Sequence, residues 1–216
     1  MIHYLYKQNS LLTQFVAELR DVNIQKDRFR FRKNLERIGQ VFAYEISKNI
    51  TYSDCDVTTP MGIATCSLSN QKIVLATILR AGLPLHNGLL SFFDKADNAF
   101  VSAYRKHHKS GAFEINMQYI TCPNIDDCVL IISDPMLATG ASIQKSIDAL
   151  LEYGKPKEIH VTVAIASTDG IRHIDRLYPD IHLWVAAEDE ELTAKSYIVP
   201  GLGDAGDLSF GSKIQD

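Results

Sequence analysis

The chain has 216 residues, 46% hydrophobic and 22% charged, which is enough for one well-filled core and too little for two typical α/β domains. Its formal net charge of −4 and its pI near 6.0 argue against a protein whose main task is to grip nucleic acid. No apolar run approaches the ~20 residues that cross a bilayer, and the first ten residues lack the pattern of a signal peptide. We therefore expect a cytoplasmic protein.

The first fifty residues have a helical pattern. Ser10 is a good N-cap for a helix with apolar residues at helical spacing, and a second helix is predicted over 27–48. The start of this second helix is rich in Lys and Arg. Because acidic residues outnumber basic ones in the whole chain, we interpret this basic segment as a solvated face or a subunit contact and not as a nucleic-acid patch. Together these helices form a predicted N-terminal extension, 1–50.

From residue 73 onward, strands alternate with helices. The predicted strands are 73–79, a short one that includes "AFVSAYR", 129–133, 159–167 and 181–187, and the predicted helices include 141–153 and 169–178. Such alternation is typical of parallel βαβ units. The segment "AFEINMQYI" alternates apolar and polar residues as a half-exposed strand does, and with "KHHKSG" it predicts a hairpin arm over 104–120 that projects from the sheet. We expect a single α/β domain over 1–216.

The four cysteines predict no metal site and no redox motif. Cys55, Cys66, Cys122 and Cys128 form no C-x-x-C pair, and no His stands at zinc-finger spacing from them. Free cysteines are commonly buried, so we expect reduced, buried thiols.

Ligands of open α/β sheets bind beyond the carboxyl ends of the strands, and three loops fall there. They are "RAGLP" after the strand 73–79, "DPMLATGAS" after the strand 129–133, and the glycine-rich "YIVPGLGDAGDLSFG" over 197–211. In the second loop, an acid and a Thr-Gly turn separate a buried strand from a helix. The unpaired N–H groups and the dipole at a helix start favour an anion, so the loop is a candidate phosphate site.

These segments together resemble the uracil phosphoribosyltransferase family. The resemblance is carried by "ILRAGL", "YR", "DPMLATGAS" and "YIVPGLGDAGDLSFG", and by the N-terminal "KDRFRFRKNLERIGQVFAYEISKN", so that it covers nearly the whole chain. It implies a type I phosphoribosyltransferase-like fold with a base-binding loop over 197–211. It also implies a transferase of pyrimidine salvage, which converts uracil and phosphoribosyl pyrophosphate (PRPP) with Mg²⁺ into UMP and pyrophosphate.

The resemblance also implies site residues. Those carried over to PRPP are Arg80, Arg105, Asp134, Pro135, Met136, Leu137, Ala138, Thr139, Gly140, Ala141, Ser142 and Asp204. Those carried over to uracil are Ile198, Gly203, Asp204 and Ala205. Among them, Arg80, Arg105, Asp134 and Asp204 are expected to act in catalysis. The chemistry fits, because guanidinium forks match pyrophosphate oxygens and a carboxylate can accept hydrogen bonds from ribose hydroxyls.

The chain departs from the family pattern at three places. The hairpin reads "YRKHHKSG" where a glutamate is usual, and Ala141 stands where many relatives have a second glycine. Ser133 precedes Asp134, so the acidic pair of other phosphoribosyltransferases is absent. We therefore expect Mg²⁺ to be held mainly through PRPP and water, with no metal site built by the protein alone.

Other readings remain open at this point. A regulator that binds nucleotides or RNA would require a basic face, and a phosphoribosyltransferase for another base would share most of the motifs. A P-loop kinase is excluded at the motif level. The sequence leaves the general base for uracil N1 unassigned, and it leaves GTP as an effector untested. We expect a homo-oligomer, a dimer or a tetramer, that binds no nucleic acid and no membrane.

Overall fold

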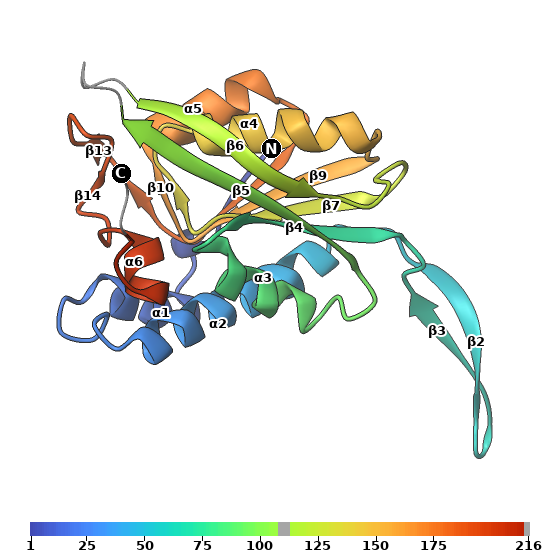
Figure 1. Cartoon of the computed structure of the whole chain (residues 1–216). Coiled ribbons are helices and arrows are strands. Elements are labelled where there is room, and N and C mark those ends of the chain that lie inside the picture. Colours follow the sequence, from blue (N-terminus) through green and yellow to red (C-terminus); the bar gives the residue numbers. More distant parts are fainter. Residues whose placement is uncertain (108–112, 214–216) are drawn as a thin grey trace.

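The structure, a computed structural model, describes residues 1–107 and 113–213; for 103–107 and 113–118 it describes the backbone alone. Its centre is a seven-stranded sheet (Figure 1). In spatial order the strands are β1 (Ile2–Tyr4), β11 (His182–Val185), β9 (Glu158–Val163), β7 (Val129–Ser133), β4 (Ile73–Leu79), β5 (Asp97–His107) and β6 (Phe113–Thr121). All neighbours are parallel except β5 and β6, which pair antiparallel. The predicted parallel α/β fold is confirmed.

Helices cover both faces of this sheet (Figure 1). On one face lie α4 (Ala141–Leu150), extended by the 3₁₀ turn η2 (Leu151–Tyr153), and α5 (Thr168–Leu177). On the other lie α1 (Leu11–Arg20), α2 (Arg28–Ser47) and α3 (Gly82–Leu90), with the 3₁₀ turn η1 (Leu5–Lys7) ahead of them. All five residues of β7 are buried, as expected for a central strand covered on two sides.

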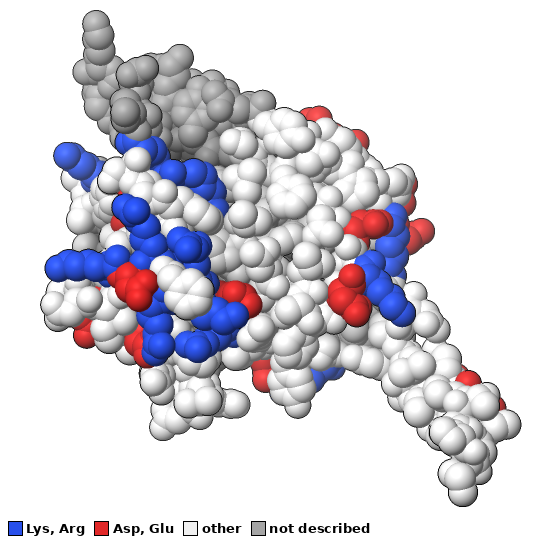
Figure 2. Space-filling view, turned by 60° about the horizontal axis from the view of Figure 1, so that its bottom comes forward, with Lys and Arg blue, Asp and Glu red and all other residues white. Residues whose placement is uncertain are grey.

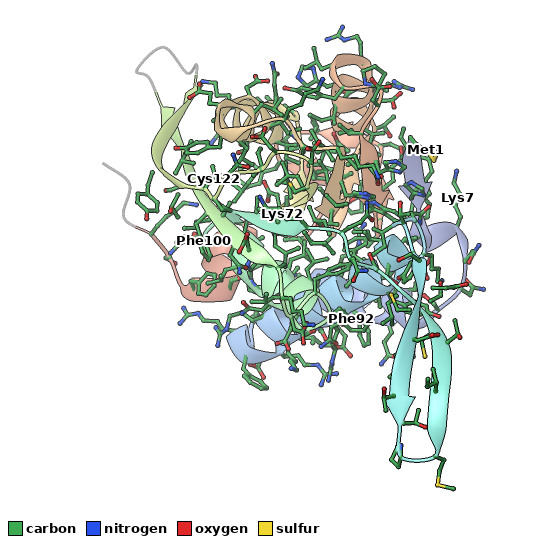
Figure 3. All side chains as sticks on the ribbon, turned by 90° about the vertical axis from the view of Figure 1, so that its right-hand side faces the viewer. Met1, Lys7, Lys72, Phe92, Phe100 and Cys122 are labelled. Atoms are coloured by element: carbon green, nitrogen blue, oxygen red, sulfur yellow. The ribbon has the colours of Figure 1, made fainter. Side chains whose placement is uncertain are left out.

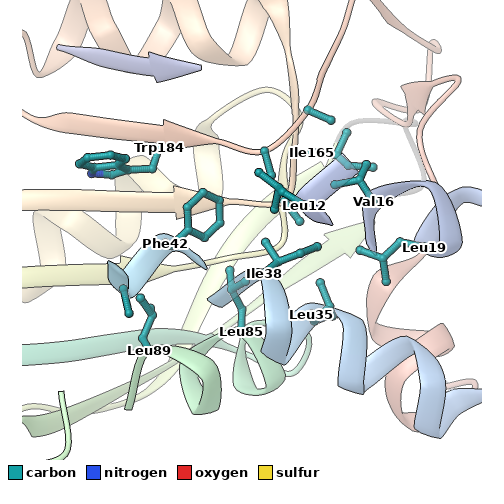
Figure 4. Packing of buried hydrophobic residues seen from close by; sticks show 14 of the residues in the cluster. Leu12, Val16, Leu19, Leu35, Ile38, Phe42, Leu85, Leu89, Ile165 and Trp184 are labelled. Carbon is teal, nitrogen blue, oxygen red and sulfur yellow. The ribbon is translucent and has the colours of Figure 1, made fainter. Parts of the chain in front are cut away.

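The sheet separates two hydrophobic clusters. The one under α1, α2 and α3 includes Leu12, Leu35, Phe42 and Leu85, all 1% exposed or less (Figure 4). The other joins the opposite sheet face to α4 and α5. The predicted helical extension is therefore part of the main core.

Two glycines allow α2 and α3 to approach closely. A Cβ added to Gly39 would collide with the carbonyl oxygen of Leu85, and one added to Gly88 would collide with that of Glu36. Because α3 follows β4 directly, this contact ties the extension to the carboxyl end of a central strand.

The two N-terminal helices begin where the sequence predicts. The Ser10 hydroxyl accepts a hydrogen bond from the N–H of Leu12, and Asp27 accepts from the first turn of α2. Basic side chains gather on the face formed by these helices, with acidic ones among them (Figure 2). Arg30 pairs with Glu18 at 2.7 Å. These internal pairs agree with a solvated face, as predicted for the Lys and Arg run.

Three strands that precede β4 were not predicted from the sequence. β1 lies within the segment expected to be helical, and it pairs in parallel with β11 at the edge of the sheet. β2 (Ser53–Thr59) and β3 (Gly62–Leu68) form an antiparallel ribbon. This ribbon, which we call the β2–β3 arm, stands away from the body (Figures 1 and 3). The expected hairpin over 104–120 corresponds to the antiparallel pair β5 and β6, with 108–112 outside the described residues. The β2–β3 arm is a second antiparallel ribbon that was not predicted.

Short strands complete the fold near the ends of the sheet. The predicted strand 159–167 divides into β9 and β10 (Ile165–Ser167), because β10 leaves the large sheet and pairs with β8 (Met136–Leu137) and β12 (Glu188–Asp189). β13 (Glu191–Leu192) pairs with β14 (Ile198–Val199), and α6 (Ala205–Phe210) closes the described chain. In the described residues, no helix is long and apolar enough to cross a membrane.

The cysteine prediction is confirmed only in part. All four thiols are free, but only Cys128 is buried, and the other three are partly exposed. Burial raises the pKa of the Cys128 thiol to about 11, so this thiol stays protonated at neutral pH.

Candidate active site

The site begins at the carboxyl ends of two adjacent parallel strands. β4 and β7 are neighbours, with Thr77 opposite Ser133. Arg80 directly follows β4 and Asp134 directly follows β7, so both emerge at the same edge of the sheet. The two predicted loops that contain them are thereby brought together.

A cleft of about 790 Å³ opens at this edge. Its walls come from β4, from the two loops and from the C-terminal segment. The bordering residues are 78–81, Ser102, 134–136, Ala138, Ser142, 195–197, 203–207 and Lys213. The three loops predicted at the carboxyl ends of strands thus border one cavity. Its volume lies in the usual range for small-molecule sites.

The loop 134–142 has the geometry of an anion site. Asp134 Oδ1 accepts a hydrogen bond from the N–H of Met136 at 3.3 Å, and Thr139 Oγ1 accepts from the N–H of Ala141 at 3.4 Å. Gly140, with φ of 84°, precedes the first turn of α4. A Cβ at Gly140 would lie 2.8 Å from the His173 ring, and positive φ is strained for other residues, so only glycine fits. The first turn of α4, with its backbone N–H groups, begins at Ala141 and lies at the cleft, which Ser142 borders.

The C-terminal segment carries a network of charges across the cleft. Asp204 Oδ1 accepts the N–H of Asp207 at 3.0 Å and so caps α6, while Oδ2 pairs with Lys213 Nζ at 2.9 Å. Asp207 Oδ1 accepts from Arg80 Nη2 at 3.0 Å, and Arg80 also donates to the carbonyl of Gly211 at 3.3 Å. An ion-pair chain therefore connects the end of β4 to the end of the described chain.

This network favours the ionised form of Asp204. Burial of the carboxyl opposes ionisation, but the hydrogen bond from Asp207 N–H and the pairing with Lys213 outweigh it, so that the pKa of Asp204 lies below its ordinary value. At neutral pH the cleft thus has a fixed negative charge beside Arg80.

The predicted site residues occupy different positions around the cleft. Arg80, Asp134, Pro135, Met136, Ala138, Ser142, Gly203, Asp204 and Ala205 border it, while Leu137, Thr139, Gly140 and Ala141 lie in the loop behind that border. Ile198 is buried, 4% exposed, in the core next to the loop. Arg105 lies on β5 opposite Ile115, and its side chain is outside the described residues.

Sequence reasoning missed part of the wall. Asp207 and Lys213 join the charge network, and 195–197 borders the cleft from the turn between β13 and β14. Asp207 stands in the glycine-rich segment 197–211, three residues after Asp204, and this position was the available signal. Within the described residues, no three His, Cys, Asp or Glu side chains are grouped to hold a metal ion.

The arrangement of the sheet and its covering helices is the type I phosphoribosyltransferase-like fold. A hypoxanthine phosphoribosyltransferase from Staphylococcus aureus shares the fold, with a TM-score of 0.51 at 13% identity over 74% of this chain and 76% of its own. A solved structure of a protein from Aquifex aeolicus matches with a TM-score of 0.89 at 29% identity over 100% of both chains.

Sequence comparison gives the particular family. The family described as uracil phosphoribosyltransferase matches residues 6–212, and this chain belongs to it. Curated uracil phosphoribosyltransferases include that of Porphyromonas gingivalis, 55% identical over 98% of both chains. That of Thermococcus kodakarensis is 38% identical over 98% of this chain and 92% of its own. The resemblance seen in the motifs is confirmed.

Proposed function

We propose that the cleft is where this protein carries out the reaction of its family, the transfer of the phosphoribosyl group of PRPP to uracil, which gives UMP and pyrophosphate. One observation carries the assignment. Arg80, the loop from Asp134 to the start of α4, and the loop 203–207 come from three separate parts of the chain and meet at one cavity. A phosphate, a sugar diol, a pyrophosphate and a base are the four groups that the two substrates bring.

The 5′-phosphate belongs at the start of α4. N–H groups there have no helical partner and point toward the incoming anion, and the helix dipole adds to the attraction. Ser142 borders the cleft and Thr139 lies two residues before the first residue of α4, so their hydroxyls can donate to phosphate oxygens. This chain has Ala141 where many relatives have a glycine, and this difference leaves the N–H and hydroxyl donors in place.

Asp134 is assigned to the ribose, and Arg80 and Arg105 to the pyrophosphate. Cleavage at the anomeric carbon builds positive charge on the sugar and negative charge on the leaving group. Carboxylates near the sugar and guanidinium forks on the pyrophosphate stabilise these charges in a site from which water is excluded. To bind pyrophosphate, Arg80 exchanges its contact with Asp207 for the substrate.

Phosphoribosyltransferases use Mg²⁺ together with PRPP. Mg²⁺ keeps several waters and commonly binds one or two carboxylates plus substrate phosphates, so we propose that PRPP and water hold most of its coordination sphere. Asp204 and Asp207, beside the proposed pyrophosphate position, are the carboxylates that would fit it. The ion adds to the neutralisation of the leaving group when bound.

The base is assigned to the loop around α6. Gly203 and Ala205 border the cleft, and backbone groups of Ile198 and of 203–205 can pair with the alternating donors and acceptors of uracil. A site that pairs with the edge of a base rejects a base with the wrong pattern, because its own polar groups are then left unpaired. The loop thus carries selectivity through backbone geometry.

Nucleotide formation tests this assignment. The protein is incubated with Mg²⁺, PRPP and one of uracil, cytosine or hypoxanthine, and nucleotide and pyrophosphate are quantified by chromatography. We expect equal amounts of UMP and pyrophosphate with uracil alone. Arg80→Lys should reduce the rate, while Arg172→Lys, on the exposed face of α5, serves as the matched control. Absence of UMP from the parent protein would refute the proposal, and the same assay with and without GTP tests effector action.

We further infer a homo-oligomer formed through the β2–β3 arm. An isolated two-stranded ribbon is marginally stable, and this one exposes Met61 at 97% and Ile63 at 74%. A second copy of the chain that covers these side chains would stabilise the arm. Light scattering tests this inference, and Ile63→Lys should give a smaller particle than the control Val22→Lys, at another exposed apolar position. A monomeric parent protein would contradict it.

A further inference from the structure

A closed set of hydrogen bonds joins the end of α1 to the loop before α6. Arg20 donates from Nη2 to Asp189 Oδ1 and from Nη1 to Asp189 Oδ2, both at 2.8 Å. Asp189 Oδ2 also accepts the N–H of Gly201 at 2.9 Å, and the carbonyl of Gly201 accepts from Arg20 Nη1 at 3.1 Å. Both backbone polar groups of Gly201 are therefore held. We call Arg20, Asp189 and Gly201 the Gly201 clasp.

The clasp is largely shielded from water. The side chain of Asp189 is 5% exposed and that of Arg20 is 24% exposed. A bidentate pair of this geometry is among the strongest side-chain contacts, and a buried carboxylate that loses its partner is costly. Each of the three residues is hydrogen-bonded to the other two, and these bonds hold Gly201 in place relative to both α1 and β12.

Gly201 occupies the turn between the proposed base-binding residues. Its φ is +58°, and a Cβ there would collide with the carbonyl oxygen of Ile198. Ile198 lies three residues before it, and Gly203 two residues after it. Leu202 and Ala205 pack in the same hydrophobic cluster as α1, so α1 supports this loop by apolar contact as well. A displacement of Gly201 would move both sides of the base site.

We propose that the Gly201 clasp positions the base-binding loop and thereby sets affinity and selectivity for uracil. Neither Arg20 nor Asp189 borders the cleft, so the pair acts through the backbone and touches neither substrate. The phosphate and ribose groups are assigned to β4, β7 and α4, which the clasp does not contact. Asp204 is held independently by its cap on α6 and by Lys213. The inference rests on the base site proposed above.

Three variants test the clasp against a matched control. Arg20→Gln removes the charge and the fork, Arg20→Lys keeps the charge alone, and Asp189→Asn keeps the volume and one acceptor. Arg30→Gln is the control, because Arg30 also makes a bidentate pair, with Glu18 at 2.7 and 2.7 Å, which joins α2 to α1 and includes no residue of the loop. Steady-state kinetics with uracil, cytosine and PRPP are measured for each.

We expect the KM for uracil to rise on the order of tenfold in Arg20→Gln, as for the loss of one well-formed hydrogen bond to the base. In the same variant, the preference for uracil over cytosine should fall, and the KM for PRPP should change by less than about threefold. Arg20→Lys should recover part of the uracil affinity and part of the selectivity. The control should match the parent protein.

Three results separate the possible failures. If the parent protein makes UMP and the clasp variants, shown to be folded by circular dichroism, keep their uracil KM and selectivity, the clasp is refuted while the proposed function stands. The clasp is also refuted if the KM values of both substrates rise equally, which is the mark of a merely structural role. If the parent makes no UMP, the proposed function itself fails. Should Arg20→Gln not fold, the milder Asp189→Asn and Arg20→Lys decide.

Discussion

Asp204 has two tasks in the structure, and two substitutions can separate them. Its Oδ1 caps α6 through Asp207 N–H, and its Oδ2 pairs with Lys213, whose side chain is 35% exposed. Asp204→Ala removes a cap that contributes about 1 kcal/mol. The partly exposed ion pair adds roughly 0.2–1 kcal/mol after screening. Asp204→Asn keeps an equally good capping group and loses only the charge.

These magnitudes give a distinct pattern for each variant. For a chain of this length, each kcal/mol lowers Tm by about 2–4 °C. Asp204→Ala should therefore melt about 2–8 °C below the parent, and Asp204→Asn should lose at most about 4 °C and always less than the alanine variant. Both variants should lose kcat/KM for PRPP on the order of 10²-fold, because both lack the carboxylate assigned to PRPP. Calorimetry and kinetics measure the two effects. Parent-like use of PRPP by Asp204→Asn would refute the assignment, and equal Tm values for the two variants would refute the cap.

Four further predictions concern the site and the core. Asp134→Asn should keep the fold and lose activity on the order of 10²-fold; a rate within about twofold of the parent would remove this carboxylate from the ribose site. Arg80→Lys and Arg105→Lys should each raise the KM for PRPP more than that for uracil, since lysine lacks the bidentate fork; unchanged PRPP affinity in both would contradict the pyrophosphate assignment. Ala205→Val, at a position 3% exposed, should crowd the base and raise the uracil KM with PRPP binding nearly intact, and equal effects on both substrates would argue against it. The pKa of His160 is lowered from 6.5 to about 3, first by burial and then by the neighbouring histidines. Between pH 6.5 and pH 3, the unfolded chain therefore binds a proton on this side chain that the folded chain does not, and the free energy of unfolding falls as the pH is lowered through this window. The slope from this group is at most about 1.4 kcal/mol per pH unit, and urea unfolding at pH 6 and pH 4.5 should show a shallower pH dependence in His160→Asn.

Local signals were sufficient for most of the fold. Ser10 and Asp27 are side chains that cap helices by themselves, and the buried strand 129–133 is apolar except for its last residue, Ser133. β1 escaped notice because three residues are too few to show alternation, and the strand exists only through its pairing with β11. Most side chains of the β2–β3 arm are exposed on both faces, so no alternation of buried and exposed residues marks its strands.

The site likewise contains residues that local motifs predict and contacts that only the tertiary structure determines. Motifs placed Arg80, Asp134 and the loop around Asp204 near the cleft, because each stands at a predictable end of a strand or in a glycine-rich segment. The pairing of Arg80 with Asp207 joins residues 127 positions apart, and the contact of Arg20 with Asp189 spans 169. Such partners are chosen by tertiary packing, and no local pattern specifies them.

The contact between Gly39 and Gly88 has a consequence for how this chain can be varied. Any larger residue at either position would push α3 away from α2, and α3 starts only two residues after Arg80. Gly88 lies about 9 Å along α3 from the start of that helix, so a larger side chain at the contact would displace the pyrophosphate side of the cleft from a distance. Libraries that randomise the extension should keep these two glycines, and hybrids that exchange the first fifty residues between relatives should exchange α3 with them.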